Sequence, residues 1–193
     1  MSAIVRQAAP IMPGMSLLRV LPLAPALIAL AACTPALNWR EVPLPPTSAV
    51  ALLPCKPDHA ERTVPLGGAP TVLSVTGCEA GGATFAVMVA KLPAGRAPDE
   101  VLAGWQQATL ANMHASAAPQ RQAFHPPGGL PLAHAQRLVA AGQQADGRPV
   151  AAQAVWTARA AEGGGTELLH AVMYAPRPQP AAADAFFAGI RWP

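Results

Sequence analysis

Few side chains in this sequence have a type and spacing that could do catalytic chemistry. No two of the five histidines lie three or four residues apart, the spacing that places two metal ligands on one face of a helix. His125 is the most interesting of them because it precedes Pro-Pro-Gly-Gly, and a histidine in a loop can face a cleft. Two interpretations of His125 stay open, a contact with a ligand or partner and an ordinary surface residue, and the second is favoured.

Nucleophiles and paired acids are equally scarce. Ser48, Ser74 and Ser116 are the only serines after residue 33, and none lies in a G-x-S-x-G or S-x-x-K motif. Asp99 and Glu100 are the only adjacent carboxylates, and a favourable interaction with a helix N-terminus explains them without acid/base chemistry. The sequence therefore predicts no catalytic residue, no cofactor and no local metal motif, while a metal site built from distant histidines stays open.

The first 32 residues have the pattern of an export signal. Arg6 and Arg19 precede an apolar run at 20–32. This run has the length of a signal-peptide core and falls short of the ~20 apolar residues that a membrane-spanning helix needs. We expect residues 1–32 to be a signal peptide that is removed on export.

The end of this leader reads Leu30-Ala31-Ala32-Cys33, which resembles the lipobox of bacterial lipoproteins. The resemblance implies that Cys33 carries a diacylglyceryl group, that cleavage occurs before it, and that its new amino group is acylated. More than one acyl chain anchors a protein stably in a membrane, whereas one chain binds only marginally. Thr34 follows in place of the aspartate that retains lipoproteins at the inner membrane, so the resemblance points to the outer membrane, with the domain in the periplasm.

Cys55 and Cys78 are the two cysteines that remain after the lipobox. An exported protein meets an oxidising compartment, which favours a disulfide between them. Such a bond closes a loop of about 24 residues and stabilises the fold by roughly 3 kcal/mol on a chain-entropy estimate. A redox pair and two metal thiolates are the alternatives, but the sequence has no C-x-x-C motif and lacks zinc-site spacing.

Residues 33–48 are predicted to form an extended tether, because the segment holds four prolines and shows no periodicity. Trp39 is unusual in such a linker. Two interpretations stay open for it: packing back on the edge of the domain, which is favoured, and contact with a partner or with the lipid interface.

The first half of the domain, which we place at 49–193, has the composition of short strands. Strands are expected at 49–53, 62–66, 71–78 and 84–92, with glycine pairs separating the last three into a meander. The run 99–116 changes to helical spacing and is expected to be the main helix.

The second half alternates loops and strands. A Pro- and Gly-rich loop is expected at 123–131, and strands at 136–144 and 150–160 flank Asp146-Gly147, a hairpin signal. A last strand is expected at 167–174, followed by a short helix at 180–189 whose Phe186 and Phe187 dock on the sheet.

This order of elements predicts an α+β fold with a mostly antiparallel sheet, a central helix and a short C-terminal helix. The Leu-Pro-x-Lys-Pro corner at 53–57 and the Ala-Phe-Phe-Ala-Gly-Ile run at 185–190 resemble the PsbP-like sandwich. The runs 38–42, 54–57 and 81–85 also resemble a family of uncharacterised proteobacterial lipoproteins. Neither resemblance implies an activity or a binding residue.

Charge excludes one class of partner. Two of the 13 basic residues lie in the leader, so the mature part is nearly neutral against its 10 acids, and no basic cluster interleaves with aromatics. We expect no nucleic-acid binding. The sequence favours a non-enzymatic envelope lipoprotein that contacts a protein or the cell wall, held to a membrane by its lipid. The alternative is a periplasmic module that binds a small ligand or metal in a cleft between sheet and helix, with His125 as the candidate.

Overall fold

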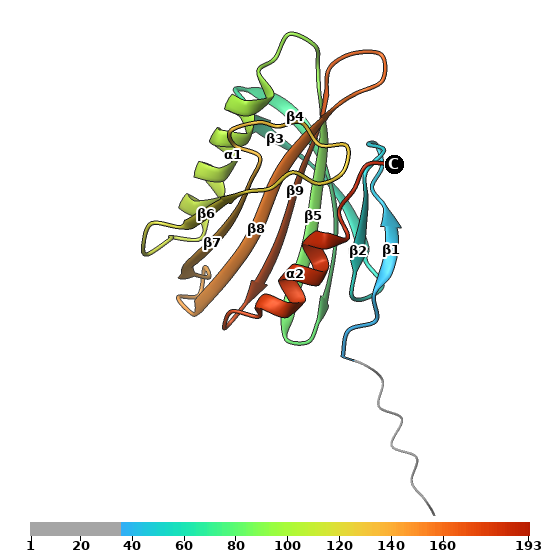
Figure 1. Ribbon diagram of the computed structural model, residues 1–193. Coiled ribbons are helices and arrows are strands. Elements are labelled where there is room, and N and C mark those ends of the chain that lie inside the picture. Colours follow the sequence, from blue (N-terminus) through green and yellow to red (C-terminus); the bar gives the residue numbers. More distant parts are fainter. Residues whose placement is uncertain (1–35) are drawn as a thin grey trace, which may run out of the picture. The chain divides into compact units, whose positions relative to one another are not determined.

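The computed structural model describes residues 36–193 (Figure 1). Cys33 and the leader therefore lie outside the described residues. In chain order the elements are β1 (Arg40–Pro43), β2 (Val50–Leu53), β3 (Asp58–Leu66), β4 (Ala69–Ala80), β5 (Ala83–Leu92), α1 (Pro98–Asn112), β6 (Gln120–Ala123), β7 (Gln136–Gln143), β8 (Pro149–Ala160), β9 (Thr166–Ala175) and α2 (Pro180–Ala188).

Seven of the strands form one sheet in the order β3-β4-β5-β9-β8-β7-β6, and every neighbouring pair is antiparallel. The first two strands form a separate hairpin. The predicted α+β class with a mainly antiparallel sheet is confirmed, and so is the meander of β3, β4 and β5. Because consecutive side chains of a strand point to opposite faces, the sheet offers two faces for packing.

Each face has its own apolar cluster. The helix α1 covers one face, where Leu102 and Trp156 are buried. The hairpin β1–β2 and the helix α2 cover the other face, where Phe85 and Phe186 meet with ring centroids 5.3 Å apart. The predicted docking of Phe186 and Phe187 on the sheet is therefore confirmed, since both are buried.

The segment 33–48, which was expected to be an extended tether, is part of the folded domain from residue 40 onward. Residues 40–43 form β1 and pair with β2, and the side chains of Val42 and Leu44 are buried in the core. The prolines in this segment suggested a solvated linker. Burial of its apolar side chains against the sheet is favourable, however, and stabilises the folded arrangement. Trp39 packs edge-on against Phe85 at 6.1 Å, which confirms the interpretation that it packs back on the domain.

Several element boundaries differ from expectation. Strand β3 begins at Asp58, four residues before the expected start, and β4 extends two residues further at each end. The helix α1 ends at Asn112 and not at Ser116, because His114 adopts a left-handed φ of 46° and the backbone carbonyl of Met113 accepts a hydrogen bond from Gln143. Strand β6 begins before the loop expected at 123–131. Its four residues are all exposed, so no apolar alternation marked it in the sequence.

The predicted covalent link is present. Cys55, just after β2, is bonded to Cys78 in β4 with their Cα atoms 6.0 Å apart. The bond joins the small hairpin to the large sheet. The predicted Asp-Gly turn between β7 and β8 is also present, with Gly147 at a φ of 81° that favours glycine.

Candidate functional site

A groove with a volume of about 770 Å³ lies between α1 and the strands β3, β4, β5 and β9. This is within the usual range for small-molecule sites. We call it the helix–sheet groove. Its lining comprises Ala60, Arg62, Val64, Pro65, Leu66, Gly67, Gly68, Leu73, Val75, Met88, Gly104, Trp105, Ala108, Thr109, Asn112, His170 and Tyr174.

Strand register builds the floor of the groove. Ala60 pairs with Val75, Val75 with Met88, and Met88 with His170, so these four side chains form one row across the sheet on the face toward α1. Three of the four are apolar. The floor is therefore an apolar surface that ends at a histidine.

The wall of the groove is a face of α1 with little bulk. Gly104, Ala108 and Asn112 follow one another at intervals of four residues, which places them on one side of the helix. A Cβ atom placed on Gly104 would have no heavy atom within 4 Å. The open space is thus a consequence of small residues where a larger side chain would fit.

His170 is the one histidine buried in this domain, with 1% of its surface exposed. Its ring stacks on Trp156 at 4.1 Å and lies edge-on to Trp105 at 5.3 Å. Desolvation lowers the pKa of His170 to about 3, partly opposed by the hydrogen bond with the backbone carbonyl of Val155. The imidazole is therefore neutral at physiological pH.

The hydrogen bond of His170 assigns its tautomer. Nδ1 lies 3.2 Å from the carbonyl oxygen of Val155, and because a carbonyl only accepts, Nδ1 must carry the proton. Nε2 is then an acceptor, and within residues 36–193 it has no hydrogen-bond partner. An acceptor of this kind, on a histidine that lines an open groove, is available to a ligand that donates.

Two further polar groups line the groove. Burial raises the pKa of Tyr174, so its hydroxyl stays protonated, and that hydroxyl bonds to no other described residue. Arg62 is exposed on β3, and among residues 36–193 it has no ion-pair or hydrogen-bond partner. Arg62 is also the one formally charged residue in the described lining. Thr109 and Asn112 in the lining are also polar and neutral. The groove thus presents an apolar surface, four neutral polar side chains and one cation.

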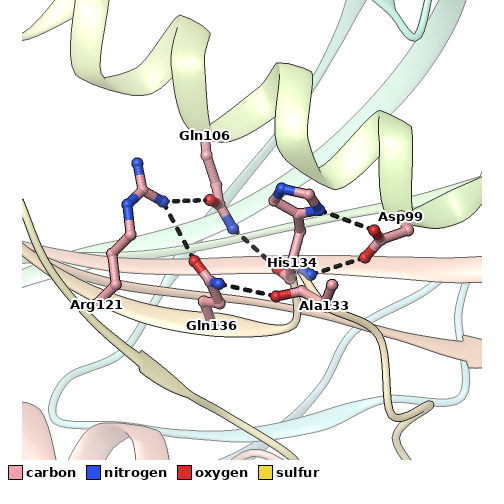
Figure 2. A network of polar contacts seen from close by, with 6 residues as sticks. All are labelled: Asp99, Gln106, Arg121, Ala133, His134 and Gln136. Atoms are coloured by element: carbon pink, nitrogen blue, oxygen red, sulfur yellow. Dashed lines mark hydrogen bonds and ion pairs between the residues drawn. The ribbon is translucent and has the colours of Figure 1, made fainter.

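A second concentration of polar groups connects α1 with β6, β7 and the loop before β7 (Figure 2). Asp99 accepts hydrogen bonds from the backbone N–H of His134 at 2.7 Å and from its ring Nδ1 at 2.8 Å. Gln106 donates to the carbonyl of His134, and Arg121 donates to the side-chain oxygens of Gln106 and Gln136. These bonds fasten the loop to the helix.

The pair Asp99 and His134 has the form of a carboxylate that orients a general base. Burial by itself would raise the pKa of Asp99, but the hydrogen bonds from His134 and its charge together lower that pKa below its usual value. No described serine, threonine or cysteine makes a hydrogen bond to His134, so the geometry supplies no nucleophile. Asp99 lies in the first turn of α1, as expected, but its carboxylate accepts hydrogen bonds from His134 in the loop before β7.

Ser48, one of the three serines considered as nucleophiles, is held in a separate polar cluster. Ser48 Oγ donates to Glu167 at 2.9 Å and accepts from Arg159 at 2.9 Å. Arg159 also donates to the carbonyl oxygen of Pro193. The cluster holds the β1–β2 loop and Pro193 against the sheet, and it contains no histidine.

His125 lies away from the helix–sheet groove. It is exposed, and its neighbour Phe124 packs toward Phe187 at 6.4 Å, on the face opposite α1. The cleft between sheet and helix that the sequence suggested is present, but its histidine is His170 and not His125. No group of three or more potential metal ligands occurs in the described part of the chain.

Sequence reasoning missed Arg62, Trp105, His170 and Tyr174 as a group. Their strands and helix were predicted, but which face each strand turns to α1 depends on register, which a single sequence does not reveal. The alternation in β9 offered only a weak signal, because both of its faces are buried.

No protein-family model, no curated protein and no solved structure matches this chain. Among the described residues, no helix is long and apolar enough to cross a membrane.

Proposed function

We propose that this protein is a lipid-anchored envelope lipoprotein whose domain binds an apolar or amphipathic small molecule in the helix–sheet groove. The observation that carries the proposal is the Nε2 acceptor of His170, which has no hydrogen-bond partner among residues 36–193 and belongs to a residue that lines an open groove of about 770 Å³. An apolar pocket with a few convergent polar groups is the usual form of a small-molecule site. This favours the ligand-binding alternative over a pure protein-contact role.

The proposed cellular location is based on the lipobox-like sequence that ends at Cys33. In this proposal the leader 1–32 is removed, Cys33 is acylated, and the domain faces the periplasm from the inner leaflet of the outer membrane. The disulfide between Cys55 and Cys78 supports an oxidising compartment. The order of strands and helices supports a PsbP-like sandwich as the finer description of the fold.

The proposed role is binding without catalysis. His170 is neutral and is held by Val155, and His134 has a carboxylate partner but no nucleophile among the described residues. A neutral, fixed imidazole suits a hydrogen bond to a ligand better than proton transfer, because its pKa is far below physiological pH.

A protein- or cell-wall-contact role is the second candidate, and one observation supports it. Strand β3 is nine residues long, lies at the edge of the sheet, and is mostly exposed. Another chain could extend the sheet along this edge. Such a partner would compete with the groove ligand only if it covered Arg62 or Val64.

Filling the groove tests the proposed binding role. The neutral dye N-phenylnaphthylamine, which fluoresces in apolar sites, should bind the wild-type domain. Gly104→Trp places bulk in open space on the groove wall and should abolish the signal, whereas Gln107→Trp on an exposed position of the same helix should preserve it. Circular dichroism should be the same for the three proteins. Equal dye binding by the two variants would disprove a ligand site here.

Metabolic labelling with a palmitate analogue tests the anchor. We expect label on the wild-type protein and none on Cys33→Ser, with Cys33 as the mature N-terminus. Equal labelling of the two, or a mature N-terminus at another residue, would contradict the lipoprotein assignment.

A further inference from the structure

The charge of the helix–sheet groove indicates which class of ligand fits it; this step rests on the proposed binding function. Arg62 on β3 is the single formal charge in the described lining. The two other titratable groups there, His170 and Tyr174, are neutral because burial lowers the pKa of the first and raises the pKa of the second. A ligand with an anionic group therefore has a partner in this groove, and a cationic ligand has none.

Arg62 is free to make that contact. It bonds to no other group in the described part of the chain, although many of the other arginines are engaged: Arg137 pairs with Asp184, Arg148 with Asp146, and Arg191 with Glu41. A guanidinium that is exposed and unpaired can take a carboxylate or phosphate in a bidentate pair without first breaking another bond.

The apolar part of the ligand has a defined surface to cover. Arg62 pairs with Leu73, and the next row toward the β4–β5 turn is Ala60, Val75, Met88 and His170. Leu66 and Val64 continue the apolar floor in the other direction, so the lining spans about 20 Å along β3 at the usual rise of a strand. Trp105 and Ala108 close the side toward α1.

We propose that the groove binds an anionic amphipath, with its carboxylate or phosphate on Arg62 and its apolar body along the floor formed by Leu73, Val75 and Met88. His170 Nε2 stands at the inner end of that floor and accepts a hydrogen bond from a ligand hydroxyl or amide, or from a water. The apolar body supplies affinity through burial, and Arg62 selects the charge.

Displacement of the dye tests the charge preference. The competitors are palmitate, cetyl phosphate, cetyl alcohol and cetyltrimethylammonium, which share an aliphatic chain and differ in the charge of the head group. We expect palmitate or cetyl phosphate to compete about tenfold better than the neutral alcohol, and the cation to compete worst. The better of the two anions identifies the head group.

The matched variants are Arg62→Gln and Arg177→Gln. Arg177 is exposed and outside the groove lining, so its variant controls for net charge. Arg62→Gln should remove the advantage of the anions and leave competition by cetyl alcohol unchanged, and Arg177→Gln should resemble the wild type.

The outcomes separate this inference from the function on which it rests. If the alcohol and the anions compete equally in the wild type, or if both arginine variants act alike, the charge assignment is wrong while the groove remains a ligand site. If no competitor displaces the dye, or if Gly104→Trp still binds it, the proposed binding function is itself overturned.

Discussion

At the scale of single residues, His170 carries the largest consequence for stability. Its folded pKa is about 3, far below the usual value of 6.5, because burial between Trp105 and Trp156 opposes the charged form. The unfolded chain therefore takes up a proton near pH 6.5 that the folded protein does not. Stability contributed by this site is present above pH 6.5 and declines as the pH falls from 6.5 toward 3.

We predict that His170→Phe removes this pH dependence. Each pH unit below 6.5 should cost the wild type about 1.4 kcal/mol through this site, or about 2 kcal/mol by pH 5, and the variant should lose less. Urea denaturation at several pH values measures the difference. Leu169→Ala, which lowers stability but keeps the imidazole, should retain the slope of the wild type; parallel curves for wild type and His170→Phe would refute the assignment.

At the scale of elements, α1 stabilises the fold but presents small residues on the side that faces the groove. It buries Val101, Leu102 and Trp105 against the sheet, yet it presents Gly104 and Ala108 to the groove. If α1 only covered the sheet, a larger residue at position 104 would increase the stability of the fold. The glycine instead leaves the volume that a ligand would fill.

We predict that Gly104→Ala stabilises the domain by about 0.5–1 kcal/mol, because alanine loses less conformational entropy in a helix than glycine and nothing lies within 4 Å of its Cβ. The contrasting variant is Gly142→Ala in β7. Its Cβ would clash with the carbonyl oxygen of Met113, so it should destabilise by more than that amount. Thermal unfolding of both proteins measures the sign, and destabilisation by Gly104→Ala would show that the glycine serves packing.

At the scale of the whole molecule, the disulfide adds a covalent cross-link between the end of the β1–β2 hairpin and the large sheet. Cys55 follows the β1–β2 hairpin and Cys78 lies in the large sheet, 23 residues further along the chain. The hairpin also packs against α2, so a loss of the bond loosens the face opposite the groove.

We predict that Cys55→Ser combined with Cys78→Ser lowers the free energy of unfolding by about 3 kcal/mol, through the larger conformational entropy of the unfolded chain. Denaturation in urea with and without reductant measures it. Reductant should destabilise the wild type to the level of the double variant and should not affect the variant. Dye binding in the groove should persist in the folded variant, since the bond lies outside the groove lining.

Much of the local structure was predictable from residue patterns alone. The meander of β3, β4 and β5, the helix α1, the Asp-Gly turn and the buried Phe186 and Phe187 follow from alternation, helical spacing and turn chemistry, which act over a few residues. The pairing of Cys55 with Cys78 was predicted from their number and from the expected export of the chain. The export and lipidation predicted for Cys33 also rest on a local pattern, and they stay predictions.

Tertiary structure decided the remaining features, because they depend on residues far apart in the chain. Residues 40–43 became a strand because β2 offered a partner, although the four prolines of residues 33–48 suggested a linker. The groove required the register that aligns Ala60, Val75, Met88 and His170 across four strands, together with a helix that crosses above them. A shift of one residue in the pairing of β9 with β5 would have turned His170 to the other face, and no short-range pattern in the sequence specifies that register.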